Sequence, residues 1–110
     1  EAIQSPVYTM ALGNAMSMAS LILAAGEKGH RKALKHSTIM IHQGSTICEG
    51  KFSDIKSGAK RMVETEEMIE ELYVKYTGKT KRKIHADLQM DLFLSSDKAV
   101  EYGLIDEVVE

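Results

Sequence analysis

The sequence is poor in residues that cross-link or stiffen small proteins. Its 110 residues include one cysteine, one proline and no tryptophan. The lone Cys48 cannot form an internal disulfide, so no oxidising compartment is required and a cytoplasmic location is expected, with an organelle stroma or matrix as an equivalent. With only two phenylalanines and a formal net charge of −2, the chain does not fit the pattern of a nucleic-acid binder.

Long apolar runs are missing too. The longest strictly apolar run covers residues 21–25, far below the ~20 residues of a membrane-spanning helix. Residues 1–6 lack the basic and apolar regions of a signal peptide, so we expect no membrane partner. The composition is nevertheless that of a globular protein, with 44% apolar and 27% charged residues. The length predicts one domain over residues 1–110.

Short apolar strands alternate with helical patterns along the chain. Strands are predicted over residues 7–12, over 37–42 with Ile39 and Ile41 on one face, and over 104–109. Short helices are predicted over 16–25, over about 81–88 with Thr80 as a cap, and from an opening at 95–97 to an end at Gly103. Gly26 is expected to end the first helix in a left-handed conformation, followed by a polar turn over 27–36. Residues 43–51 suit a loop or an edge strand. This alternation predicts an α/β fold.

The longest periodic element lies in the middle of the sequence. Apolar residues recur every seven positions at Ile55, Met62, Ile69 and Tyr76. The pattern predicts an amphipathic helix over about 53–77, with Ser53 or Asp54 as its N-cap and Gly78 at its end. A stripe of that length needs a partner, either within the domain or on another subunit.

Ser17 is the strongest chemical candidate, because it lies where a glycine breaks a strand and a helix begins. The free N–H groups of a first helical turn point toward any oxyanion that forms there. Ser17 could equally be a simple helix cap, since serine is favoured at that position. The surrounding pattern differs from the G-x-S-x-G elbow of the α/β-hydrolases.

A nucleophilic serine needs a base and an acid that orients the base. His42 closes an apolar strand and could hold its imidazole at the rim of a site, although a structural role is equally open. His30, His36 and His85 are expected to be solvated. Asp91 has apolar neighbours, and a carboxylate there would need a hydrogen-bonded partner. Other candidate acids are Asp87, Asp97 and Asp106.

Two other kinds of site are not supported by the sequence. The six-residue steps between His30, His36 and His42 match none of the usual zinc spacings, so no metal site is expected. Residues 78–80 resemble the end of a phosphate loop, but Tyr73 stands where that motif needs its first glycine.

Several stretches together resemble the proteolytic subunit of Clp proteases. They are GNAMSMASLILAAGEKGHRKAL, STIMIHQ, YTGKT and DLQMDLFLSSDKAVEYGLIDEVV. The resemblance covers nearly the whole chain. It implies a fold of the ClpP/crotonase type, with repeated strand–helix turns, a protruding handle helix and the N-terminal part of the fold missing.

The resemblance also implies a serine endopeptidase that cuts unfolded polypeptides through an acyl-enzyme. Carried over residue by residue, the nucleophile is Ser17, the base His42 and the orienting acid Asp91. The backbone N–H of Met18 would bind the oxyanion. Residues Gln43, Gly44, Ser45 and Thr46 would begin the wall of the substrate groove. The implied partners are identical subunits in a heptameric ring and a Clp-type AAA+ ATPase, which uses ATP, so no cofactor is expected in this chain.

Besides the missing N-terminal part, the sequence departs from the family pattern at three motifs. Gly44-Ser45 stands where the family usually has a proline, and Met16 precedes the serine in place of alanine. Gln89-Met90 replaces a charged arrangement that joins two rings, which weakens the expectation of a double ring. The alternatives are therefore an inactive fragment or paralogue that serves assembly, or a relative of phage maturation proteases. An acyl-CoA enzyme of crotonase type would not need all three triad residues.

Overall fold

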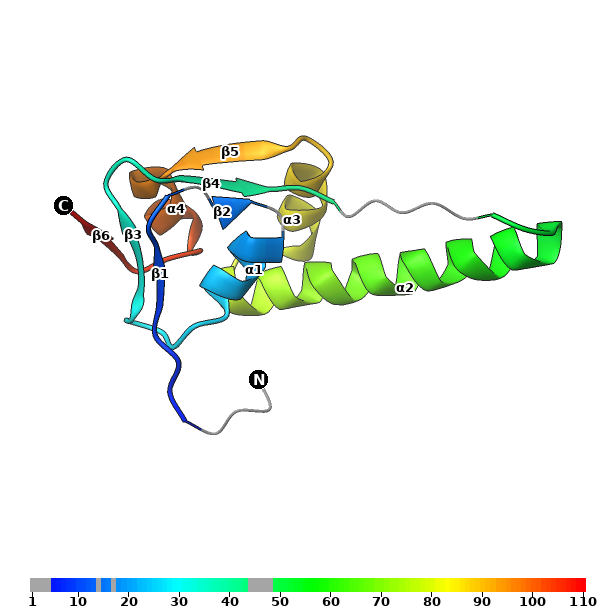
Figure 1. Ribbon diagram of the computed structural model, residues 1–110, viewed down its shortest axis with the longest axis horizontal. Coiled ribbons are helices and arrows are strands. Elements are labelled where there is room, and N and C mark those ends of the chain that lie inside the picture. Colours follow the sequence, from blue (N-terminus) through cyan, green and yellow to red (C-terminus); the bar gives the residue numbers. More distant parts are fainter. Residues whose placement is uncertain (1–4, 14, 17, 44–48) are drawn as a thin grey trace.

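The computed structural model describes residues 5–13, 15–16, 18–43 and 49–110. Its strands and short helices form a head from which one long helix extends (Figure 1), and the molecule measures 52 × 32 × 24 Å. Both the α/β class and the protruding helix were predicted, and both are confirmed.

The described strands form two three-stranded sheets. The first has the order β1 (Thr9–Ala11), β3 (Arg31–Leu34) and β6 (Glu107–Val109), all parallel. The second places β4 (Thr38–Ile41) between β2 (Ala15–Met16) and β5 (Leu92–Ser95), parallel to the former and antiparallel to the latter. The chain crosses between the sheets at β1–β2 and at β3–β4, so the sheets share one core.

Four helices are described: α1 (Met18–Ala24), α2 (Phe52–Thr77), α3 (Lys81–Leu88) and α4 (Ser96–Tyr102). The predicted ends at Gly78 and Gly103 are confirmed, since both glycines have left-handed φ angles of 76° and 95°. Thr80 caps α3 as predicted, because its hydroxyl accepts the Lys83 N–H at 3.2 Å.

Two predicted helix caps are wrong. The N-cap of α2 is Lys51, and Asp54 instead accepts the Lys51 N–H at 3.1 Å from the third helical position. Gly26 is not among the residues with positive φ. Packing explains the glycine at position 26, because a Cβ on that residue would lie 2.5 Å from Thr9 Oγ1.

Three strands were not predicted: β2, β3 and β5. The strand β3 lies in the segment expected to be a polar turn, since its residues Arg31, Lys32, Ala33 and Leu34 have no apolar run. It alternates buried Arg31 and Ala33 with half-buried neighbours. Its burial depends on Asp106, a partner 75 positions away, which no local pattern reveals.

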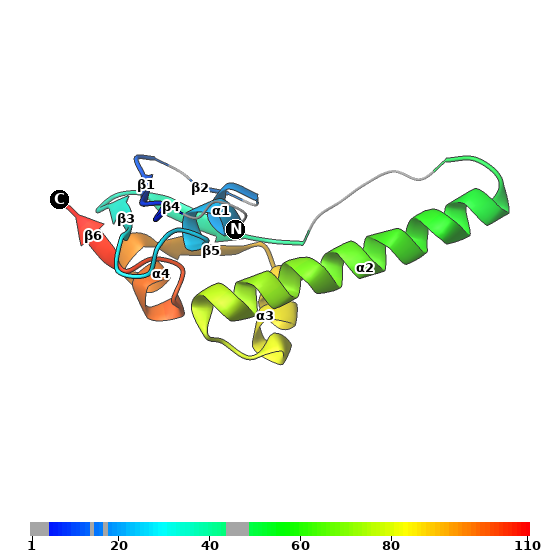
Figure 2. The same ribbon diagram turned by 90° about the horizontal axis from the view of Figure 1, so that it is seen from below.

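The core lies where both sheets meet α1 and the last turns of α2. Ile39 and Ile41, predicted to share one face of β4, are both fully buried. Tyr73 and Tyr76 bring α2 into the same cluster. Viewed from below, α3 runs beside the base of α2, while the first turns of α2 extend away from the head (Figure 2).

Candidate functional site

His42 and Asp91, far apart in the sequence, are adjacent in the structure. His42 Nδ1 lies 3.7 Å from Asp91 Oδ1, with exposed fractions of 28% and 67% for the two side chains. This distance exceeds the ~3.2 Å upper limit of an ordinary N–H···O hydrogen bond. The pair is therefore a loose polar contact at the surface, with the imidazole partly sheltered and the carboxylate open to water.

The last turn of α3 and the end of β4 together position this pair. The backbone N–H of Gln43 donates to the Leu88 carbonyl at 2.8 Å, which ties the residue after His42 to α3. Asp91 lies three residues after Leu88 and has a φ of 49°. This is a left-handed conformation that aspartate adopts more readily than most residues. That turn directs the chain into β5, whose first residue, Leu92, pairs with Ile41 directly before His42.

Other proposed site residues are only partly described. Ser17, Gly44, Ser45 and Thr46 lie outside the described residues. The neighbours of Ser17 are described: Met16 pairs with Met40 in the parallel β2–β4 ladder, and Met18 begins α1. The position before Ser17 is thus in register with a residue two positions before His42. Gln43 is exposed next to the histidine.

The burial argument for Asp91 is wrong, because its neighbours Met90 and Phe93 are themselves exposed. Among the described residues, Asp87 and Glu70 are the buried acids, and Asp106 is partly buried. Asp87 accepts a hydrogen bond of 2.5 Å from the Tyr102 hydroxyl. Burial is the main cause that raises the pKa of Tyr102 far above its usual value, and the hydrogen bond to the Asp87 carboxylate raises this pKa further.

Asp106 belongs to a structural network. Its two carboxylate oxygens accept bonds of 2.8 Å from Nε and Nη2 of Arg31. These bonds hold the pKa of Asp106 well below its ordinary value. Arg31 also donates to the Tyr76 carbonyl at 2.9 Å, near the end of α2. The network joins β3, α2 and the approach to β6.

The remaining histidines differ from one another. His30 stacks on Tyr8 with ring centroids 4.0 Å apart. His85, which was expected to be merely solvated, contacts the buried Glu70 carboxylate through Nδ1. The hydrogen bond with Glu70, followed by the negative charge of Glu70, raises the pKa of His85. The prediction of a simply solvated His85 is therefore wrong.

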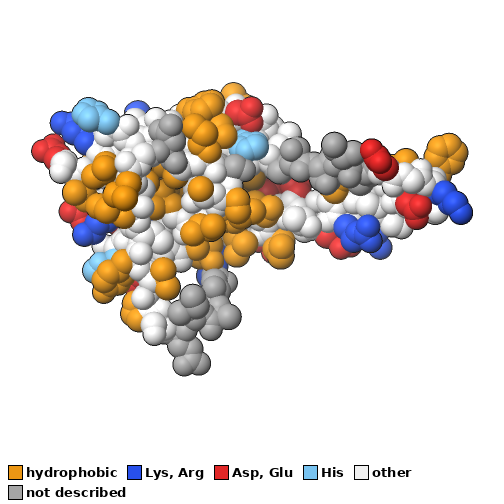
Figure 3. All heavy atoms as spheres, viewed as in Figure 1, with side chains coloured by type: hydrophobic (Ala, Val, Ile, Leu, Met, Phe, Trp, Pro, Cys, Tyr) orange, Lys and Arg blue, Asp and Glu red, His pale blue; other side chains and the backbone are white. Residues whose placement is uncertain are grey.

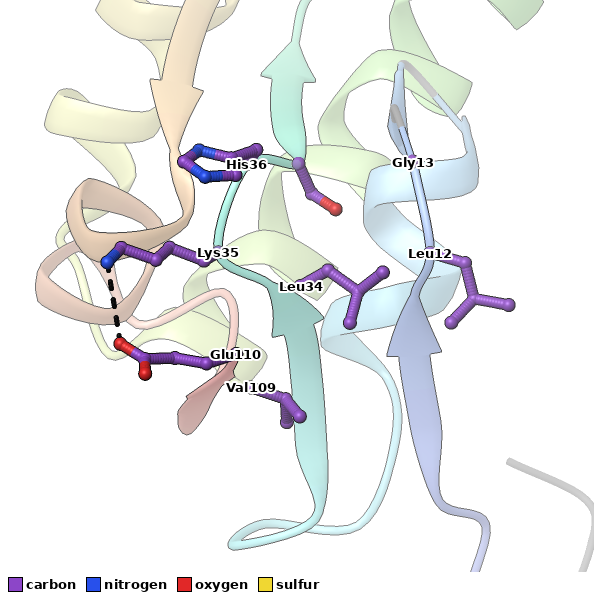
Figure 4. A pocket seen from close by; sticks show the side chains of 8 residues that line it. Leu12, Gly13, Leu34, Lys35, His36, Val109 and Glu110 are labelled. Atoms are coloured by element: carbon purple, nitrogen blue, oxygen red, sulfur yellow. Dashed lines mark hydrogen bonds and ion pairs between the residues drawn. The ribbon is translucent and has the colours of Figure 1, made fainter.

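A pocket of about 270 Å³ lies away from the His42–Asp91 pair. Leu12, Leu34 and Val109 supply its apolar walls, and an ion pair of 3.4 Å between Lys35 and Glu110 lies at its edge (Figure 4). Among the proposed catalytic residues that the structure describes, neither His42 nor Asp91 lines it. It is thus separate from the site where bond cleavage is expected.

Within the described part of the chain, the helices fall short of the length and apolarity needed to cross a membrane.

Comparisons with known proteins agree with the resemblance seen in the sequence. The family model described as Clp protease matches residues 1–110. The ATP-dependent Clp protease proteolytic subunit of Deinococcus radiodurans is 42% identical over 108 residues, which is 98% of this chain and 53% of that relative. The chain therefore spans about half the length of the curated relative it matches. Its sequence and its α/β architecture place it in one family: the chain belongs to the Clp proteases.

Proposed function

We propose that the chain carries the catalytic residues of a serine endopeptidase, the proteolytic subunit of an ATP-dependent Clp-type protease acting on unfolded polypeptides. The observation that carries this proposal is the meeting of His42 and Asp91, with Nδ1 and Oδ1 at 3.7 Å. Membership of the Clp protease family supports a peptidase. The Asp–His contact then suggests the residues that perform it.

In the proposed mechanism, His42 uses its two nitrogens for different tasks. Nδ1 faces Asp91, which leaves Nε2 to accept the proton from the Ser17 hydroxyl as the serine oxygen attacks the peptide carbonyl. The backbone N–H of Met18 would stabilise the oxyanion. The protonated imidazole then gives its proton to the leaving amine, and water hydrolyses the acyl-enzyme by the reverse sequence.

The loose Asp–His contact must tighten for this role. Shortening it to ~3 Å requires a shift of less than about 1 Å, and catalytic hydrogen bonds often tighten only when substrate binds. Asp91 can make this shift because its side chain is exposed and unhindered by a core. The extended segment that begins with Gln43, Gly44, Ser45 and Thr46 would pair with the substrate backbone, which recognises any sequence.

Assembly is the second part of the proposal. Family membership supports an oligomer and a Clp-type ATPase partner in general terms, and we propose a homomeric heptameric ring in the cytoplasm. The first turns of α2 expose large apolar side chains, namely Phe52, Ile55, Met62 and Val63. These residues suit a contact with another subunit. ATP would be consumed by the partner, so no cofactor is assigned to peptide hydrolysis.

An inactive assembly subunit is the alternative function. The observation that favours it is the exposure of Asp91, whose carboxylate is 67% accessible and does not reach hydrogen-bonding distance of His42. In that case α2 would still mediate assembly, but Ser17 would lack an activated base.

Labelling with a fluorophosphonate probe separates the two functions. An active serine peptidase should be labelled, and Ser17→Ala should abolish labelling. His42→Ala and Asp91→Asn should slow labelling by about 10²- to 10⁴-fold, as in other triads. His36→Ala is the matched control and should label like the parent, since His36 lies on the pocket of Figure 4. An unlabelled but assembled parent protein would favour the structural subunit.

A further inference from the structure

Three side chains of types that bind metals converge outside the proposed peptidase site. Glu66 and Glu70 lie one turn apart on α2, and His85 projects from α3, which packs beside that part of the helix. One carboxylate oxygen of each glutamate and one ring nitrogen of the histidine all lie within 4.8 Å of one another. The two helices thus bring together a nitrogen and two oxygens from separate parts of the sequence.

Glu70 makes this cluster different from an ordinary group of surface acids. Its side chain is only 4% exposed, whereas those of Glu66 and His85 are 36% and 57% exposed. Within the described residues, the polar contact recorded for its carboxylate is the one to His85 Nδ1. A buried carboxylate is unfavourable unless a positive charge compensates it. The carboxylate therefore points at a place where a cation would be stabilised.

We propose that Glu66, Glu70 and His85 bind a divalent transition-metal ion, with Zn²⁺ as the preferred ion. Imidazole and carboxylate donors suit Zn²⁺, whereas Mg²⁺ and Ca²⁺ favour sites made only of oxygen atoms. Three protein ligands would leave the fourth tetrahedral position to water.

The geometry requires only small adjustments. Metal–ligand bonds of ~2.0–2.1 Å place tetrahedral donors ~3.3 Å apart. His85 Nδ1 now lies 3.9 Å from Glu66 Oε1, so Glu66 must approach slightly. The long 3.4 Å bond from Gln89 Nε2 to Glu66 Oε1 is weak enough to give way. His85 must draw back from Glu70 to admit the ion, and it can do so because its ring is more than half exposed.

The charges around the cluster also favour a cation. With a neutral imidazole, the two carboxylates carry a charge of about −2. Lys81 on α3 is paired with Glu71, with Nζ 3.9 Å from its carboxylate, and its charge only partly offsets the effect of the glutamates on the pKa of His85. Lys83 is paired with Asp87 at 3.3 Å. Neither lysine makes a recorded contact with the carboxylates of the cluster, so the charge there is left for an added ion.

An ion at this site would tie α2 to α3. The Leu88 carbonyl at the end of α3 accepts the Gln43 N–H beside His42, so the metal would hold the helix on which the proposed catalytic pair depends. The metal site itself requires no peptidase activity.

The test is Zn²⁺ binding to the metal-free protein, measured by calorimetry in a Cys48→Ser background to remove the thiol. One equivalent should bind, and Co²⁺ should give the intense visible absorption of a tetrahedral site. His85→Ala and Glu70→Gln should each weaken binding by about 100-fold or more. Because Glu70 is buried, Glu66→Gln serves as a variant of an exposed ligand and should weaken binding by about 10-fold or more.

Two controls keep the test specific. Glu67→Gln alters an exposed neighbouring acid on α2, and His36→Ala alters a histidine outside the cluster. Both should bind Zn²⁺ as the parent does. Absence of a one-equivalent site, or binding that survives in both His85→Ala and Glu66→Gln, would overturn the proposal and leave the cluster as an ion pair between Glu70 and protonated His85.

Discussion

The two halves of α2 have the same sequence periodicity but different surroundings. In the second half, Tyr73 and Tyr76 are buried against the head. In the first half, Ile55 and Met62 occupy the same stripe, yet they are 40% and 39% exposed. Figure 3 shows orange side chains on both the head and the far tip of the helix. A heptad stripe therefore indicates which face of a helix is apolar, but not whether the same chain covers it.

The second half of α2 is anchored by polar contacts as well as by packing. The Tyr76 carbonyl accepts bonds from Arg31 at 2.9 Å and from Lys28 at 2.6 Å. The Tyr73 hydroxyl lies 2.9 Å from Ser20 Oγ on α1. The second half therefore contributes to folding, whereas the exposed first half suits the contact with another subunit that is proposed above.

Removing the Arg31–Asp106 pair should have the largest effect on the anchored half. Asp106→Asn would leave the Arg31 guanidinium buried without its counter-charge, which typically costs about 3–5 kcal/mol. Urea unfolding at pH 7 measures this loss. Glu107→Gln is the control, because its 3.6 Å pair with Lys32 is exposed and should contribute less than about 1 kcal/mol.

The same variant should also change the acid sensitivity. Arg31 lowers the native pKa of Asp106, so the pair contributes fully above the ordinary carboxyl pKa of about 3.9 and is lost as the pH falls below that value. Asp106→Asn should therefore lose less stability between pH 5 and pH 3, as rough limits, than the parent does. Equal losses in both proteins would contradict the assigned role of the pair.

The second-largest loss of unfolding free energy is expected when the contact between Gly103 and the end of α2 is disturbed. Gly103 has a φ of 95°, and a Cβ there would lie 2.3 Å from the Thr77 carbonyl oxygen. Gly78 is also left-handed, at 76°, but its Cβ would meet nothing within 4 Å. Gly78→Ala should cost about 1–2 kcal/mol from backbone strain alone, and Gly103→Ala about 3 kcal/mol or more. Equal losses of unfolding free energy would remove the steric explanation.

Truncating one isoleucine in each half compares the halves directly. Ile69 packs against the core cluster, so Ile69→Ala should cost about 1–2 kcal/mol of unfolding free energy. Ile55→Ala should cost less than about 0.5 kcal/mol, because the side chain is exposed. Similar costs, measured by thermal and urea unfolding at low protein concentration, would show that the first half is also packed in solution.

A charge in the exposed first half of α2 should have the smallest effect on the isolated chain. Met62→Glu should change the unfolding free energy by less than about 0.5 kcal/mol but weaken self-association at least about 10-fold, because it places a charge on the exposed apolar stripe. Sedimentation velocity measures the association. Lys60→Glu is the control on the same exposed part of α2. Ile69 is unsuitable for this test because it packs against the head. An unchanged association constant would argue against the first half of α2 as an interface.

Local chemistry allowed much of the fold to be predicted. The ends of α2, α3 and α4 follow from Gly78, Thr80, Ser95 and Gly103, whose caps act within a few residues. Strand β4 was visible because Ile39 and Ile41 lie on one face of a short, largely apolar stretch. The strands β2 and β5 were missed because two to four residues carry too little periodicity, and their pairing with β4 comes from distant segments.

Only part of the candidate sites could be predicted from the sequence. The resemblance selected His42 and Asp91, and the structure brings them to 3.7 Å; their roles, with those of Ser17 and Met18, remain proposals. The cluster of Glu66, Glu70 and His85 was missed. The i,i+4 spacing of its glutamates is common on helices, and nothing in the sequence places His85 against them.

By itself, the sequence determined the α/β alternation, most helix ends, the apolar face of α2 and the resemblance to Clp proteases. These properties depend on side chains interacting within a few residues, or on motifs read in order. Only the tertiary structure decided that Arg31 is buried on Asp106, that half of the α2 stripe is covered, and that His85 meets Glu70. Each of these depends on the free energy of groups far apart in the chain coming together, which local patterns do not encode.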